Sequence, residues 1–141
     1  MCNIWKIASR WSYDGNKNSS IIDIFRKYNI VFAGRKQYDI KRSVKPNDII
    51  ALSDGTTVVS VGKITDIPKP ITEFNFDELD RNSGRFNYEE WVIGFKVNLY
   101  DLKSEDWFKY NRGTFHKVYE PHRIKIKSLF EKYNAYENKE D

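Results

Sequence analysis

The fold is decided by residues 44–55, which have the sequence Val44-Lys45-Pro46-Asn47-Asp48-Ile49-Ile50-Ala51-Leu52-Ser53-Asp54-Gly55. Pro46 suits the second position of a tight turn, and the apolar run that follows has the length of a buried strand. Asp54-Gly55 separates this run from a second apolar run at 57–64, and Asp-Gly in that position is a strong hairpin signal. We therefore predict a turn, a buried strand and a hairpin that leads into a return strand.

A second informative stretch lies at the start of the chain. Residues 3–12 have the sequence Asn3-Ile4-Trp5-Lys6-Ile7-Ala8-Ser9-Arg10-Trp11-Ser12. The alternation predicts a strand over 4–8 that ends in polar and aromatic side chains. Further apolar runs predict strands at 30–33 and 91–102, and a short last strand at 114–119.

Helices are predicted between and after these strands. Ser20 and Asp23 have the spacing of a capping box, and Asn29 suits the left-handed end of the same helix. A second helix is predicted from Pro121 to about residue 133, because its apolar residues recur at i, i+3, i+4 and i+7. These residues are Ile126, Leu129, Phe130 and Tyr133.

This order of elements predicts an α+β fold, a small mixed β-barrel flanked by two or three helices. A chain of 141 residues has the length of one domain, which we expect to span residues 1–133. Residues 134–141 are polar and are expected to form a C-terminal tail.

Charge is distributed unevenly along the chain. The formal net charge is +4, and the isoelectric point is near 9.0. Residues 73–90 carry 6 acidic and 2 basic side chains, whereas the rest of residues 1–133 carries 21 basic and 11 acidic ones, an excess of 10. This excess permits nucleic-acid binding, and we expect the acidic segment 73–90 to be a long surface loop that contains at most one helical turn.

The chain has one cysteine, Cys2, so no disulfide can form within it and a reducing compartment is favoured. No apolar stretch approaches the roughly 18 residues of a membrane span. Residues 1–6 lack the features of a signal peptide. We expect a cytoplasmic protein that does not bind a membrane.

No pattern in the sequence predicts catalysis or the binding of a metal or cofactor. The two histidines, His116 and His122, lack Cys or Asp residues at the spacing of a zinc site, and no glycine-rich phosphate loop is present. Adjacent carboxylates such as Glu89 and Glu90 would point to opposite faces of a strand, so they do not form an acid–base pair. We expect no metal, no cofactor and no catalytic residue, and favour binding over enzymatic activity.

The order of these segments resembles that of the EVE and YTH domains of the PUA-like superfamily. Residues 4–9, a helix, and then residues 29–34 (Asn29-Ile30-Val31-Phe32-Ala33-Gly34) resemble the opening of those domains. Residues 44–53 resemble the segment of those domains in which a lysine and a glycine-aspartate pair precede an apolar strand that ends near a serine. Residues 59–64 resemble the return strand, and residues 91–102 resemble the later strand that ends in an acidic turn.

The resemblance implies binding of a modified, for example methylated, base of DNA or RNA in an aromatic pocket at one barrel end. The residues that it assigns to this pocket are Ser9, Arg10, Trp11, Phe32, Leu52, Ser53 and Asp54. Ser9 would meet the base edge, Trp11 or Phe32 would stack on the base, and Asp54 would accept a hydrogen bond from an exocyclic amine. The nucleic-acid backbone would be bound by Arg10 and by Arg35, Lys36, Lys41 and Arg42.

The sequence leaves two other functions open. A small hydrolase of modified nucleosides on the same barrel would use Lys6 or Asp54 as a base or nucleophile partner. A protein-interaction module would use the acidic segment 73–90 as its contact surface. The sequence also leaves open whether the protein works alone or beside a protein effector subunit.

Overall fold

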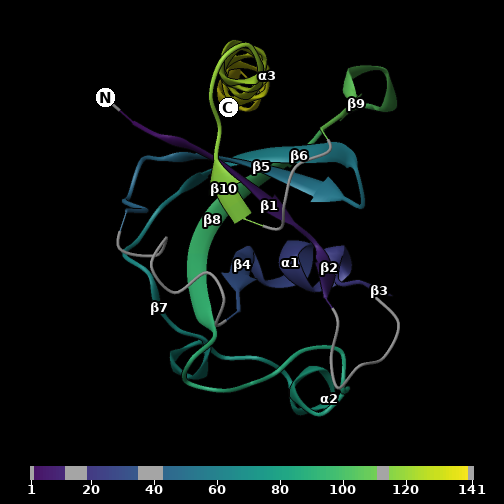
Figure 1. Ribbon diagram of the computed structural model, residues 1–141, viewed down its shortest axis with the longest axis vertical. Coiled ribbons are helices and arrows are strands. Elements are labelled where there is room, and N and C mark those ends of the chain that lie inside the picture. Colours follow the sequence, from purple (N-terminus) through teal and green to yellow (C-terminus); the bar gives the residue numbers. More distant parts are fainter. Residues whose placement is uncertain (1, 12–18, 35–42, 111–114, 140–141) are drawn as a thin grey trace.

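A curved sheet of eight strands forms the centre of the computed structural model, which describes residues 2–11, 19–34, 43–110 and 115–139 (Figure 1). The strands of this sheet are β1 (Ile4–Ala8), β4 (Ile30–Ala33), β5 (Ile49–Asp54), β6 (Thr57–Ile64), β7 (Lys69–Pro70), β8 (Ile93–Asp101), β9 (Phe108–Lys109) and β10 (Phe115–Lys117). A separate pair consists of β2 (Arg10–Trp11) and β3 (Ser19–Ser20). The helices are α1 (Ile22–Tyr28), α2 (Glu78–Arg81) and α3 (His122–Lys139), with short 3-10 turns at Ile71–Glu73 and Ser104–Asp106.

The strand order of the sheet is β10-β1-β5-β6-β8-β4. Within the described residues, β1 and β5 run parallel and the other pairs are antiparallel. Strand β8 bends, so that its first half pairs with β4 and its second half pairs with β6. The sheet therefore curls into a half-barrel. The predicted α+β class with flanking helices is confirmed, but a closed barrel is not, because β10 and β4 do not pair in the described residues.

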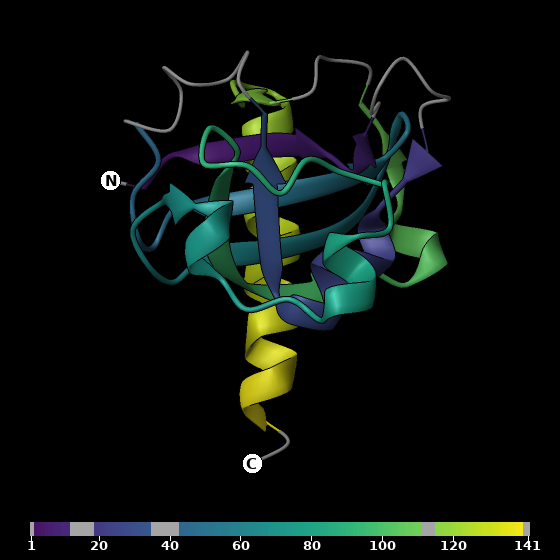
Figure 2. The same cartoon turned by 90° about the horizontal axis from the view of Figure 1, so that it is seen from below.

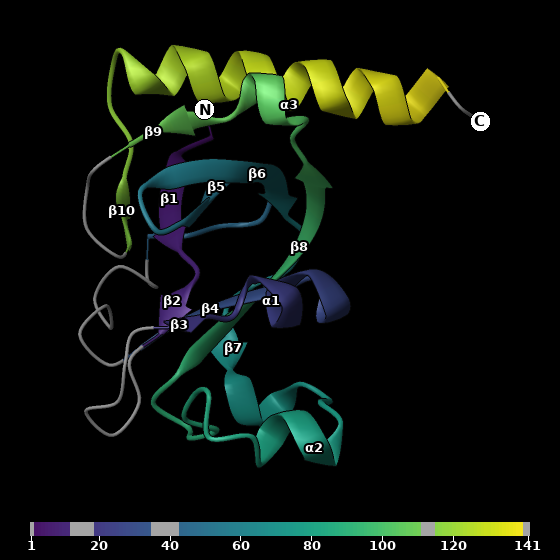
Figure 3. The same cartoon turned by 90° about the vertical axis from the view of Figure 1, so that its right-hand side faces the viewer.

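The two faces of the sheet are covered by different elements, as Figure 3 shows. Helix α3 crosses the convex face, where Ile126 and Phe130 pack with Ile4, Ile49 and Ala51. On the concave face, the core gathers side chains from α1, the strands and the segment around α2. Its members include Trp5, Ile7, Phe25, Ile50, Leu52 and Phe95. Because β5 is buried on both faces, its sequence is a continuous apolar run rather than an alternating one.

The turn before β5 is tied to β1 by one carboxylate. Asp48 is 4% exposed and accepts hydrogen bonds from Trp5 Nε1 at 2.9 Å, from the backbone N–H of Asn3 at 3.1 Å and from that of Lys45 at 3.0 Å. Asn47 takes the left-handed conformation, with φ of 78°, which lets the turn aim Asp48 inward. Residues 3–12 and residues 44–55 are thus joined through Asp48.

The acidic segment 73–90 is part of the fold rather than only a surface loop. Phe76 and Phe86 are buried in the concave core. Its carboxylates at Asp77 and Asp80 both lie 2.9 Å from Lys27 Nζ on α1. The predicted helical turn is confirmed as α2, and the segment closes one side of the core.

The helices differ in detail from the predicted ones. The predicted capping box is wrong, since α1 begins at Ile22 with no side-chain cap and Asp23 instead pairs with Arg85 at 2.6 Å. Asn29 ends α1 in the left-handed conformation, as predicted. Helix α3 continues to Lys139 instead of ending near residue 133, and its C-terminal part projects past the sheet (Figure 2). In the described part of the chain, no helix is long and apolar enough to cross a membrane.

Candidate binding site

Ser9 lies at the edge of the sheet where the parallel strands β1 and β5 both end. It is fully buried, and its Oγ and its backbone N–H both donate to the carbonyl oxygen of Ser53 at 2.8 Å. The Ser9 carbonyl accepts a hydrogen bond from the N–H of Ile21, just before α1, at 2.7 Å. Ser9 is therefore held in place from two sides. Its hydroxyl oxygen keeps the capacity to accept a further hydrogen bond.

Arg10 and Asp54 form an ion pair at this edge. Arg10 Nη2 lies 3.3 Å from Asp54 Oδ1, and the two side chains are 42% and 35% exposed. Arg10 also lies across the hairpin turn, because a Cβ added at Gly55 would be 3.2 Å from Arg10 Nε. An ion pair between side chains this exposed stabilises the fold by at most about 1 kcal/mol. Asp54 Oδ1 itself is buried and has no hydrogen-bond partner among the described residues. We call Ser9, Arg10 and Asp54 the rim.

Trp11 follows the rim directly. It belongs to β2, and its backbone pairs with that of Ser19 in β3. The four basic residues predicted to bind the nucleic-acid backbone, Arg35, Lys36, Lys41 and Arg42, lie outside the described residues.

Phe32 and Leu52 are core residues in this structure. Phe32 is 1% exposed and packs edge-on against Phe25, with ring centroids 4.7 Å apart, and against Phe86 at 4.9 Å. Leu52 has no exposed surface and belongs to the same concave core. A base would therefore touch Phe32 only after neighbouring side chains had moved.

The side chain of Ser53 is separated from the rest of the predicted pocket. Ser53 pairs with Val58, which belongs to the convex core, and alternation along β5 gives Ser53 the same face as Ala51. Its Oγ is buried and has no hydrogen-bond partner among the described residues. The contribution of Ser53 to the rim is its carbonyl oxygen, which positions Ser9.

A group of titratable side chains lies together on the convex face, and the sequence did not predict that they would meet there. Lys6 is 2% exposed, and burial lowers its pKa to about 8. Its neighbour in the sheet is His116, whose Nε2 lies 3.1 Å from the hydroxyl of Tyr110. Tyr110 also stacks on His122 at 4.2 Å between ring centroids. The strand pattern predicts Lys6 on the face opposite Trp5, but it does not predict that this face is buried.

A cavity of about 630 Å³ adjoins this group and is lined by Tyr110, His116 and His122. In the part of the chain that the structure describes, no cluster of three His, Cys, Asp or Glu side chains is arranged to hold a metal ion.

The pKa of Lys6 predicts how stability depends on pH. Because its folded-state pKa, about 8, is below the ordinary value of 10.5, the unfolded chain binds more protons between these two values. The free energy of unfolding should therefore rise as the pH increases from about 8 to about 10.5, by a Lys6 contribution on the order of 3 kcal/mol at most. Lys6→Met should lack this contribution, so its stability relative to the wild type should fall across the same window.

Urea unfolding at pH values from 7 to 10.5 would measure this difference. Lys63→Met removes one positive charge from a half-exposed position of β6 and serves as the control. A stability difference between Lys6→Met and the wild type that stays constant over the window would contradict the prediction.

Among the comparisons with known proteins, only the comparison with solved structures finds a similarity, and it concerns the fold. No protein-family model matches the chain, and no curated protein sequence is significantly similar to it. A crystal structure of ASCH from Zymomonas mobilis is similar, with a TM-score of 0.50 and 10% sequence identity, over 90% of this chain and 95% of that chain. The ASCH domain has a PUA-like fold. The likeness shows that the present chain shares the fold of that ASCH domain, in agreement with the predicted PUA-like fold, and it does not single out the EVE/YTH type.

Proposed function

We propose that this protein is a nucleic-acid-binding module of the EVE/YTH type that recognises a modified base, such as a methylated one, without catalysis. The observation that carries the proposal is the rim, where the buried Ser9 is followed along the chain by the half-exposed Arg10, which pairs with Asp54 at the end of the neighbouring strand β5. Trp11 is the next residue after Arg10. This order of residue types on a PUA-like fold matches the resemblance drawn from the sequence.

The chemistry of the rim suits one base and its phosphate. Ser9 Oγ, whose proton is already donated to the Ser53 carbonyl, would accept a hydrogen bond from the base edge. Asp54 would accept one from an exocyclic amine once Arg10 turned to a phosphate. Trp11 would stack on the base, an interaction that contributes about 1–3 kcal/mol. Phe32 and Leu52 would lie deeper, and Ser53 would act through its carbonyl oxygen.

The charge distribution supports a polyanionic partner. Outside the segment 73–90, residues 1–133 carry 21 basic and 11 acidic side chains. We propose that Arg35, Lys36, Lys41 and Arg42 bind the backbone of the nucleic acid, in the cytoplasm, either alone or beside a protein effector subunit.

The two alternative functions, a protein-interaction module and a nucleoside hydrolase, have less support than nucleic-acid binding. The acidic segment 73–90 is occupied in packing Phe76 and Phe86 and in pairing Asp77 and Asp80 with Lys27. A hydrolase that used Lys6 would have its site on the convex face beneath α3, whereas Asp54 belongs to the rim.

Trp11→Ala tests the proposed pocket. We expect it to weaken binding of a fluorescently labelled oligonucleotide with a methylated base by about five-fold or more, because a stacking partner is lost. Tyr119→Ala is the control, since Tyr119 is an aromatic residue that is 67% exposed and lies between β10 and α3. Fluorescence anisotropy titrations, with modified and unmodified oligonucleotides in parallel, would measure the affinities.

Two results would count against the proposal. Equal affinities for Trp11→Ala and the wild type would reject the pocket. An affinity that did not fall between about 50 and 200 mM salt would reject the backbone contacts, because each phosphate that is neutralised releases counterions.

A further inference from the structure

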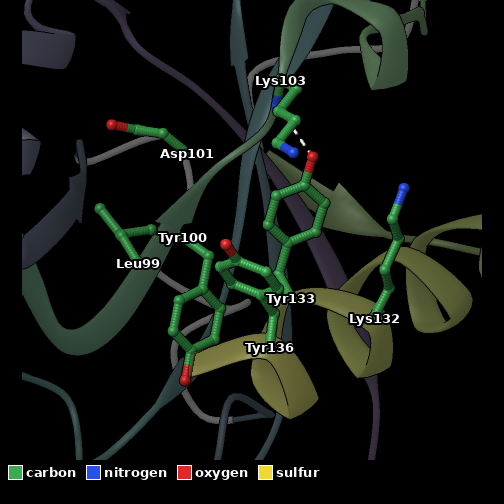
Figure 4. Close-up of a pocket in the computed structure, with 7 residues that line it drawn as sticks. All are labelled: Leu99, Tyr100, Asp101, Lys103, Lys132, Tyr133 and Tyr136. Atoms are coloured by element: carbon green, nitrogen blue, oxygen red, sulfur yellow. Dashed lines mark hydrogen bonds between the residues drawn. The ribbon is translucent and has the colours of Figure 1, made fainter. Parts of the chain in front are cut away.

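A pocket of about 450 Å³ lies between the end of β8 and the C-terminal part of α3 (Figure 4). Three tyrosines and two lysines are among the residues that line it: Tyr100, Lys103, Lys132, Tyr133 and Tyr136. Figure 4 shows the three rings gathered together, with Lys103 beside Tyr133 and Asp101 pointing away from the rings. The volume falls within the range of small-molecule sites, which runs from about 300 to 1,000 Å³.

Hydrogen bonds fix two of the rings. Tyr133 donates its hydroxyl to Asp106 at 2.6 Å and accepts from the N–H of Lys103 at 2.9 Å. The hydroxyl of Tyr100 donates to Asn134 Oδ1 at 2.9 Å. These rings are therefore positioned without a ligand, which lowers the entropic cost of binding one. Tyr136 is 61% exposed and offers the open wall of the pocket.

The charges around the pocket favour an anion. Asp101 pairs with Arg26 at 2.8 Å, and Asp106 pairs with Lys132 at 3.0 Å, so both nearby carboxylates are already compensated. Lys103 Nζ lies 6.0 Å from the centre of the Tyr136 ring. Helix α3 itself carries five Lys or Arg residues and two Glu residues. The ion pair with Asp106 also compensates Lys132, so Lys103 supplies the positive charge beside the flat aromatic walls. This combination suits a ligand that has both an aromatic ring and a negative charge.

The topology connects this pocket with the rim. Strand β8 is antiparallel to β6, which is antiparallel to β5, so β8 and β5 end at the same edge of the sheet. Leu52, Ser60 and Asp101 lie in register across these strands. Neighbouring strands are about 4.8 Å apart, so the ends of β5 and β8 are separated by roughly 10 Å. The pocket lies on the convex side of β8, where Tyr100 packs with Phe130 of α3, so a nucleic-acid strand that enters both sites passes around this edge of the sheet.

We propose that the pocket of Tyr100, Tyr133 and Tyr136 binds a second nucleotide of the same single strand whose modified base enters the rim. The base stacks on Tyr136 and Tyr100, and Lys103 binds its phosphate. Stacking of this kind tolerates any base, so the pocket adds affinity and direction to the strand without adding sequence preference. This inference rests on the proposed function.

The test compares Tyr136→Ala with Tyr136→Phe and with Tyr119→Ala. The Phe variant keeps the ring, and Tyr119 is an equally exposed tyrosine, at 67%, that lies before α3. Anisotropy titrations would use labelled single strands on the order of 10 nucleotides that carry one methylated base. Tyr136→Ala should weaken binding about five-fold or more, while Tyr136→Phe and Tyr119→Ala should bind like the wild type. Binding of the free methylated nucleoside should not change in any variant.

Each other outcome has a definite meaning. If the wild type binds the oligonucleotides and Tyr136→Ala binds them equally well, the second-nucleotide site is wrong and the proposed function stands. If Tyr136→Phe loses as much affinity as Tyr136→Ala, stacking is not the interaction and the inference fails. If the wild type binds neither the nucleoside nor the oligonucleotides, the proposed function is wrong, and this inference falls with it.

Discussion

Asp48→Ala is expected to lower the free energy of unfolding by about 3 kcal/mol or more. The carboxylate is 4% exposed and accepts from three donors, Trp5 Nε1 and the backbone N–H groups of Asn3 and Lys45. Alanine would leave these donors without their partner in a site that water hardly enters, and each unsatisfied donor costs about 1–3 kcal/mol. Urea unfolding, followed by tryptophan fluorescence, would measure the loss.

A double-mutant cycle with Trp5→Phe would show how much of this loss comes from the indole. In the Asp48→Ala background, Trp5→Phe should cost less than in the wild type, because the hydrogen bond of 2.9 Å is already absent. Asp66→Ala is the matched control, since Asp66 also accepts from a backbone N–H, that of Ile67, but on the exposed surface. A loss below about 1 kcal/mol for Asp48→Ala would mean that the turn holds without the carboxylate.

Most strands could be predicted because their signals are local. β1, β4 and β6 have the predicted bounds, and β5 continues past the apolar run 49–52 up to the Asp54-Gly55 turn. In each case an apolar run is bounded by turn residues, so neighbouring residues alone determine where the strand begins and ends.

Contacts between distant parts of the chain could not be predicted in the same way. The bond from Trp5 to Asp48 joins residues that are 43 positions apart. Lys6 is buried between its sheet neighbours Ala51 of β5 and His116 of β10, and nothing within β1 specifies those pairings. The acidic composition of segment 73–90 suggested a solvated loop, but Phe76 and Phe86 decide its position, since burial of an aromatic ring outweighs a few exposed charges.

The sequence placed some residues of the candidate site near one another along the chain, but it did not give the direction of every side chain. Ser9 and Arg10 are the first two residues after the predicted strand 4–8, and Asp54 belongs to the turn predicted after the run 49–52. The pairing of β1 with β5 therefore brings the three residues together. The side chain of Ser53 lies on the other face, because successive residues of a strand alternate between faces. The resemblance supplied positions along the chain, whereas the face of each side chain depends on the register of the sheet.

Gly62→Ala should have the second large effect on stability, with an expected loss of about 3 kcal/mol or more. Strands β6 and β8 approach so closely that a Cβ at position 62 would lie 2.3 Å from the carbonyl oxygen of Asn98 and 3.2 Å from the Cα of Leu99. Both atoms belong to the backbone, so the clash could be relieved only by moving the strands apart. Because β8 leads directly into Tyr100 and Lys103, the same movement should weaken oligonucleotide binding at the second-nucleotide site.

Gly84→Ala is the matched control for this prediction. Gly84 has a φ of +76° and an added Cβ there would meet no atom within 4 Å, so alanine should cost only the strain of the left-handed conformation, about 1–2 kcal/mol. Urea unfolding of the two variants side by side would separate a packing clash from backbone strain. Equal losses in the two variants would mean that β6 and β8 can separate easily. The bend of β8, and with it the alignment of the rim and the tyrosine pocket along one edge, would then not depend on the close approach at Gly62.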